Sequence, residues 1–247
     1  MQGSMWRWSD SGLVSFCSGG DIMQPKKLIC IGGLTDGLLA CPWVPELSKL
    51  AGDCNWSTTQ PLLTSSYTGY GTGSLSRDTE ELSSFILQLK NKFNTQDIVI
   101  VGHSTGCQNA CHFTANGDAE AVALVSGIAL QAAVSDQEAG LLEPSASNYL
   151  QFAREQPTDK LDSLMPIEAH WTPISVRRFL SLFEKYGDDD YFSSYLTDSE
   201  LSSKLAHFDG LPNLKGIGYW SYVVLFTVIV LNIIMPSTIL IYHQESF

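Results

Sequence analysis

Residues 102–106 read Gly-His-Ser-Thr-Gly, a G-x-S-x-G pattern centred on Ser104. The pattern follows an apolar run at 98–101 and precedes a segment, 108–113, that can form a helix. A serine on a sharp strand-to-helix turn exposes its Oγ, and the flanking glycines let other backbone approach without a clashing Cβ. The start of the helix would add free N–H groups and a positive dipole end for a developing oxyanion. The pattern therefore predicts acyl-transfer chemistry with Ser104 as the nucleophile; the alternative is a tight structural turn.

A second glycine-containing loop, residues 31–37 (IGGLTDG), could complete this chemistry. An oxyanion hole takes one backbone N–H from the residue after the nucleophile, which here is Thr105, and another from a loop that follows an earlier strand. Leu34 comes directly after the glycine pair of this loop. We therefore expect the N–H groups of Leu34 and Thr105 to form the oxyanion hole, with an ordinary glycine turn as the alternative.

Charge and cysteine usage argue against several other kinds of site. Lys and Arg number 14 against 26 Asp and Glu, and this net charge of −12 without a basic cluster argues against nucleic-acid binding. The six cysteines form no C-x-x-C pair and the N-terminus lacks a signal peptide, so we expect reduced, mostly buried thiols in an intracellular protein. His103, Cys107 and Cys111 are interpreted as one packed helix face, and no metal or cofactor is predicted. The run Asp188–Asp190 is interpreted as a solvated loop that attracts a cation weakly at most.

The elements that must position Ser104 follow from the apolar patterns. Runs at 26–33, 97–104 and 121–130 predict strands that are buried on both faces, as in a parallel sheet covered by helices. Apolar residues at helical spacing predict a helix through Leu82, Phe85, Ile86, Leu89 and Phe93. Further expected elements are a short helix within 42–52, a strand within 55–65, a helix that starts at Thr172-Pro173 and is stopped by Gly187, and a helix capped by Thr197 and Glu200. The alternation predicts a doubly wound α/β fold.

Four long motifs together resemble one family. They are IGGLTDG at 31–37, SYTGYGTGSLSRDTEEL at 66–82, VGHSTGCQ at 101–108 and YGDDDYFSS at 186–194. They resemble the α/β-hydrolases grouped with the fungal fusarinine C esterase and its plant relatives, over residues from about 8 to about 214. The resemblance implies a mostly parallel α/β-hydrolase fold, ester-hydrolysing ancestry and a small-molecule ester substrate. It does not imply a siderophore as that substrate.

The resemblance stops where the family places its catalytic acid and base. Members continue with an acidic segment resembling ADEYVP and a late histidine, in the order Ser, Asp, His of the fold. Here residues 207–215 pass directly into an apolar segment, so neither group has a counterpart. Asp136 and His243 are the candidates by position: Asp136 lies just past the strand at 121–130, and His243 is the only histidine late enough in the chain. The resemblance therefore predicts that the last strands of the sheet are missing and leaves the acid and the base unassigned.

The apolar segment has three interpretations. Residues 219–242 carry no charge, and a membrane span takes roughly 20 residues. Because Lys204 and Lys215 precede this stretch, it could anchor a cytoplasmic body to a membrane. Two buried strands split near Pro236 would have a similar composition. The third interpretation is an unspliced or alternative transcript.

These observations predict two domains and leave two functions open. Residues 1–215 are expected to form a truncated hydrolase domain with a helical cap or insertion at about 135–210, followed by a hydrophobic tail at 216–247. The first function is a serine hydrolase of the carboxylic-ester type, impaired because the acid and the base are absent. The alternative is a non-catalytic truncated isoform that is tethered to a membrane or acts by interaction. Oligomeric state is left open.

Overall fold

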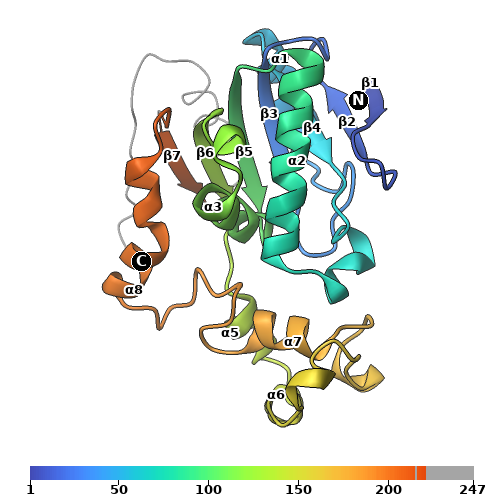
Figure 1. The fold of residues 1–247 in the computed structure, drawn as a ribbon, viewed down its shortest axis with the longest axis vertical. Helices are drawn as coiled ribbons and strands as arrows, with labels where there is room; N and C mark the ends of the chain where they lie inside the picture. The colour runs from blue at the N-terminus through green and yellow to red at the C-terminus, as the bar shows by residue number, and fades with distance from the viewer. Residues whose placement is uncertain (215, 221–247) are drawn as a thin grey trace.

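The apolar runs form the middle of a seven-stranded sheet in the computed structural model, which describes residues 1–214 and 216–220 (Figure 1). The strands are β1 (Gly3–Arg7), β2 (Val14–Ser18), β3 (Lys26–Ile31), β4 (Ser57–Pro61), β5 (Asp97–His103), β6 (Val125–Gln131) and β7 (Gly216–Trp220), in the spatial order β1-β2-β4-β3-β5-β6-β7. From β4 to β7 all neighbours are parallel, whereas β1 and β2 pair antiparallel. The prediction of a mostly parallel α/β sheet is confirmed.

Helices connect the parallel strands. The α-helices are α1 (Val44–Asp53), α2 (Leu75–Phe93), α3 (Gly106–Asn116), α4 (Ala119–Val122), α5 (Asp136–Gly140), α6 (Ala146–Arg154), α7 (Val176–Phe183) and α8 (Asp198–Leu205). Short 3₁₀ helices span Tyr67–Thr72, Thr158–Lys160, Ile167–Ala169 and Ala206–Gly210. Helix α2 carries the predicted apolar stripe on its buried face, so that prediction is confirmed.

The run of apolar residues at 98–101 in the central strand β5 is explained by what covers this strand. Ile98 and Ile100 belong to the apolar cluster that includes α2 and α3, while Val99 and Val101 belong to the cluster that includes α1. Side chains alternate between the two faces of a strand, so helices on both faces require an apolar residue at every position. This double covering fixes the end of β5, and Ser104 follows directly after it.

The segment between β6 and α8 forms a helical cap beyond the end of the sheet that carries Ser104 (Figure 1). Helices α6 and α7 share a separate apolar cluster with Tyr70, from the 3₁₀ helix before α2. The expected capping box of Thr197 and Glu200 begins α8. Helix α7 begins later than predicted, because Ser175, whose Oγ accepts from the Arg178 N–H, caps it instead of Thr172.

The strands at the two edges of the sheet were not predicted from the sequence. The β1–β2 hairpin was not predicted, because Trp6 is the single buried side chain of β1 and no apolar run marks this strand. Strand β7, in the range predicted as a hydrophobic tail, pairs parallel with β6 from Gly127–Gly216 to Gln131–Trp220. Its five residues therefore extend the sheet beyond β6.

The predicted membrane span lies almost wholly outside the described residues, which include only Tyr219 and Trp220 of 219–242. His243 lies outside them as well. Among the helices of the described ranges, none is long and apolar enough to cross a bilayer.

Candidate active site

Ser104 occupies the turn between β5 and α3 with a backbone φ of 52°. Residues other than glycine rarely adopt positive φ, so the surrounding bonds must hold this conformation. The Ser104 N–H donates to the Gln131 carbonyl of β6 at 3.0 Å, and the Cys107 N–H donates to the Ser104 carbonyl at 2.9 Å. The predicted strand-to-helix turn at Ser104 is therefore present, with the backbone strain typical of a nucleophile elbow.

The two glycines of the G-x-S-x-G pattern lie where backbone segments are in close contact. A Cβ on Gly102 would lie 2.5 Å from the Gly106 carbonyl oxygen, and a Cβ on Gly106 would lie 2.4 Å from that of Ile31. Any side chain at either position would push α3 away from β5 or β3. The pattern thus has a steric cause at both glycines.

The loop after β3 packs directly against Ser104. A Cβ on Gly33 would lie 3.0 Å from Ser104 Cβ and 3.5 Å from its Oγ. Asp36 closes this loop, because its Oδ2 accepts from the Gly33 N–H at 2.7 Å and its own N–H donates to the Gly33 carbonyl at 3.0 Å. Sequence reasoning missed Asp36. Its position three residues after a glycine is the signal, since an aspartate often closes a turn through nearby backbone N–H groups.

The two predicted oxyanion donors share one pocket with this loop. Leu34 and Thr105 both line it, beside Gly33 and Asp36. Within the described chain, the N–H groups of Leu34 and Thr105 donate no hydrogen bond. The cavity is about 50 Å³, against ~300–1,000 Å³ for common ligand pockets, so this conformation admits only the reacting part of a substrate.

Polar side chains, two of them buried, form another wall of the same pocket. Asp78, Asn109 and Arg178 line it, and Asn109 Nδ2 donates to Asp78 Oδ2 at 3.2 Å. Burial raises the pKa of the Asp78 carboxyl to about 6. Arg178 Nη1 donates to Asp189 Oδ2 at 2.5 Å, with 5% and 1% of the two side chains exposed. The wall is therefore polar and contains a fixed cation.

The interpretation of residues 188–190 as a solvated loop is wrong for two of the three aspartates. Asp189 and Asp190 are each 3% exposed. Asp189 pairs with Arg178 and accepts from Ser181 Oγ at 2.6 Å, while Asp190 accepts from the Tyr186 N–H at 2.9 Å. These carboxylates are buried because the fold supplies a cation and donors at this point.

The described residues do not give Ser104 a histidine partner. Each of the four described histidines hydrogen-bonds another side chain: His103 with Gln131, His112 with Thr79, His170 with Tyr70 and His207 with Thr114. Asp136 Oδ2 accepts from Gln108 Nε2 at 3.0 Å, and no described histidine bonds to Asp136. Burial, together with the nearby Asp189, raises the pKa of Asp136 to about 7. A base for Ser104 is thus not provided by these contacts.

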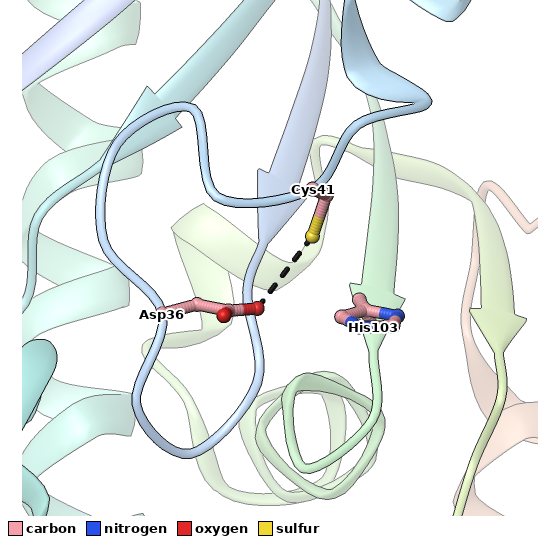
Figure 2. Close-up of side chains that lie close together, drawn as sticks. All are labelled: Asp36, Cys41 and His103. Carbon is pink, nitrogen blue, oxygen red and sulfur yellow. Dashed lines mark hydrogen bonds between the residues drawn. The ribbon is translucent and has the colours of Figure 1, made fainter.

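The predicted grouping of His103 with Cys107 and Cys111 is not the arrangement found. Cys107 and Cys111 lie on the buried face of α3, whereas His103 ends β5 and lies near Asp36 and Cys41 (Figure 2). The Cys41 thiol donates to Asp36 Oδ2 at 3.6 Å, and burial together with Asp36 raises its pKa to about 12. Cys41 is therefore not a thiolate nucleophile at neutral pH. All six cysteines are free; five are buried and Cys54 is half-buried.

Sequence comparisons identify relatives that cover most of the chain. Residues 9–212 match the family described as "Protein of unknown function (DUF1749)". The UPF0613 protein PB24D3.06c of Schizosaccharomyces pombe is 33% identical over 225 residues, which cover 85% of this chain and 70% of the relative. Fusarinine C esterase sidJ of Aspergillus fumigatus is 32% identical over 254 residues, covering 83% of this chain and 70% of that protein.

Solved structures agree with these relatives. The siderophore hydrolase EstB from Aspergillus fumigatus superposes with a TM-score of 0.70 at 28% identity, covering 89% of this chain and 76% of EstB. An α/β-hydrolase-fold protein of unknown function superposes with a TM-score of 0.50 at 13% identity, covering 94% and 95% of the two chains, which supports the fold alone. The chain therefore belongs to the DUF1749 family, is related to fusarinine C esterase, and has the α/β-hydrolase fold that its motifs predicted.

Proposed function

We propose that this chain is a serine esterase core in which Ser104 attacks the carbonyl carbon of a small-molecule ester. The strained turn at Ser104, against the Gly33 loop, is the observation that carries the proposal. Ser104 Oγ forms a bond to the carbonyl carbon and the carbonyl oxygen becomes an oxyanion. The N–H groups of Leu34 and Thr105 donate to that oxyanion. The bond between the carbonyl carbon and the alcohol oxygen then breaks, and the alcohol leaves with the proton that Ser104 Oγ lost. Water next attacks the acyl-enzyme, which releases the carboxylic acid and returns a proton to Ser104 Oγ.

The substrate we propose is a carboxylic ester with a polar group near the scissile bond. Asp78, Asn109 and Arg178 line the pocket that also contains Leu34 and Thr105. Two relatives are named as a fusarinine C esterase and a siderophore hydrolase, which supports a small-molecule ester as the substrate. Asp78 Oδ1 and Arg178 Nε have no hydrogen-bond partner within the described residues, and an apolar acyl chain would leave these two atoms unpaired, at a cost in binding.

We further propose that these 247 residues hydrolyse esters far more slowly than a relative with an acid and a late histidine. Proton transfer from Ser104 needs a base, and the four described histidines are bound to other side chains. Loss of triad members lowers kcat by ~10⁴–10⁶ and leaves the contribution of binding and of the oxyanion hole. The residual rate should therefore still depend on Ser104.

A fluorophosphonate probe tests the nucleophile without knowledge of the substrate. We expect slow labelling of the full chain, with the adduct located on Ser104 by mass spectrometry and absent from Ser104→Ala. Turnover of an activated ester is measured in parallel with a relative that keeps the acid and histidine, at matched folded fractions. A folded chain whose Ser104 is never labelled would contradict the nucleophile. Turnover equal to that of the relative would contradict the impairment and indicate another base.

The alternative function is a non-catalytic, membrane-tethered or interaction protein. It is favoured by the uncharged stretch at 219–242 together with the lack of a histidine partner for Ser104 among the described residues. Flotation with phosphatidylcholine vesicles tests membrane tethering. A tethered chain floats with the vesicles, and a chain shortened after residue 220 does not. Flotation of neither protein would exclude tethering by this stretch.

A further inference from the structure

Asp36, Cys41 and His103 come together from three parts of the chain. Asp36 and Cys41 lie between β3 and α1, and His103 is the last residue of β5. One donor atom from each side chain lies within 4.8 Å of the other two. Figure 2 shows the carboxylate and the thiol directed toward one another, with the imidazole beside them. The cluster thus combines one oxygen, one sulfur and one nitrogen donor.

The donor set and its spacing match those of a zinc site. Zinc accepts thiolate, imidazole and carboxylate together, and sites with three protein ligands keep a fourth position open. Bond lengths of about 2.3 Å to sulfur and about 2.0 Å to oxygen place two such ligands of a tetrahedral ion about 3.5 Å apart. The 3.6 Å between Cys41 Sγ and Asp36 Oδ2 agrees with that separation. Closing the imidazole onto the ion requires a shift of about 1.5 Å at most, because the three donor atoms already lie within 4.8 Å of one another.

Neighbouring groups orient two of the three donors. His103 Nδ1 bonds to Gln131 Oε1; because a carbonyl oxygen only accepts, Nδ1 carries the proton and the Nε2 lone pair remains available. Metal-binding histidines commonly hold their second nitrogen in this way. Asp36 is held by the Gly33 N–H at 2.7 Å. A Cβ on Gly32 would lie 2.5 Å from Asp36 Cβ, so the glycine at 32 makes room for the carboxylate.

We propose that Asp36, Cys41 and His103 bind one Zn²⁺ ion, with the open position toward the pocket that Asp36 and Cys41 line. Binding replaces the thiol proton of Cys41, which passes to solvent, and no electron is transferred. The site is separate from the esterase proposal, because none of its three donors acts in the acyl chemistry described above. It shares the loop of Gly33, however, so the bound ion would stiffen the backbone that packs against Ser104.

Cobalt(II) serves as the spectroscopic probe on the full chain. We expect one Co²⁺ per chain, with a thiolate-to-cobalt charge-transfer band and the intense visible bands of tetrahedral coordination, both removed by Zn²⁺ because zinc binds such sites more tightly. Cys41→Ser should lose the charge-transfer band and bind Zn²⁺ at least ~10-fold more weakly. Ser104→Ala should bind as the natural chain does, which distinguishes failure of the metal site from failure of the esterase proposal.

Two further variants keep the test decisive. Cys54 is the most accessible cysteine of the chain. If cobalt bound to an accessible thiol by chance, Cys54→Ser would lose the charge-transfer band; we expect this variant to retain the full band. Asp36→Asn keeps an oxygen that accepts from the Gly33 N–H but removes the charge, and it should weaken binding by at least ~10-fold even where Cys41→Ser fails to fold. The site would be overturned if the charge-transfer band persists in Cys41→Ser or is lost in Cys54→Ser. It would also be overturned if cobalt binds without a thiolate ligand, or if Asp36→Asn binds Zn²⁺ with unchanged affinity.

Discussion

Gly33 lies against Ser104 so closely that a Cβ added to it would be 3.0 Å from Ser104 Cβ and 3.5 Å from Ser104 Oγ. The contact joins the loop after β3 to the turn after β5, two segments about 70 residues apart in the chain. Asp36 holds Gly33 in this position through its carboxylate. The geometry of the proposed nucleophile and that of the proposed oxyanion loop are therefore coupled.

Gly33→Ala should lower the reactivity of Ser104 with little loss of stability. The new methyl group must displace Ser104 or the loop by a few tenths of an ångström, which misplaces the Leu34 N–H relative to Oγ. We expect fluorophosphonate labelling to slow by about 10- to 100-fold. Gly210→Ala is the matched control, because nothing lies within 4 Å of its added Cβ. Equal labelling rates for the two variants would contradict the oxyanion role of this loop.

Arg178→Met should destabilise the protein strongly. It leaves Asp189 buried, with 1% of its side chain exposed and no counter-charge at 2.5 Å. Breaking one side of a buried pair costs about 3–5 kcal/mol in the free energy of unfolding, whereas replacing both sides by apolar residues is often neutral. Urea unfolding of Arg178→Met and of the double variant Arg178→Met/Asp189→Leu measures both effects. A single variant that loses less than about 1 kcal/mol would show that the pair is not a stabilising contact.

Asp136→Asn should make the protein more stable above pH 7 and leave it nearly unchanged near pH 4. The pKa of Asp136 is about 7 in the folded protein, against ~3.9 in an unfolded chain, so between these values the folded state binds more protons. The free energy of unfolding therefore falls as pH rises from 4 to 7, and this part of the slope disappears in the variant. The gain at pH 8 is on the order of 4 kcal/mol, because each pKa unit of the shift corresponds to ~1.4 kcal/mol. The free energy of unfolding of both proteins is measured across this pH range. If the two differ by the same amount at every pH, Asp136 is not a buried, protonated carboxyl.

Removal of β7 should cause self-association. Every residue of β6 is buried, and β7 pairs with its outer edge. A chain that ends at residue 214 would expose that edge, which can pair with another copy, whereas a chain that ends at 220 retains β7. Light scattering after size-exclusion chromatography should show larger species for the shorter chain alone. Identical behaviour of the two chains would show that β7 does not protect the edge.

Several features of the fold could be predicted from the sequence because they depend on local patterns. The apolar runs of β3 and β5 indicate burial on both faces, and the helical spacing in α2 indicates burial on one. Ser104 could be located because a nucleophile turn needs glycines two residues before and after it, and both meet backbone within 2.5 Å. Such patterns depend on which faces of a single element are buried, so they can be recognised without knowing which elements pack against it.

The polar contacts of the site were decided by tertiary structure. Asp189 was expected in solvent, yet Arg178 of α7 reaches it and makes burial favourable. His103 was grouped with cysteines at regular spacing, yet the parallel pairing of β5 with β3 places it near Asp36 and Cys41, which follow β3. The sequence by itself determined the central strands β3 and β5, helix α2 and the turn at Ser104, because the burial pattern of each of these elements follows from its own residues. Only the tertiary structure decided which charges, thiols and imidazoles meet, because those contacts join segments whose distance along the chain says nothing about their distance in space.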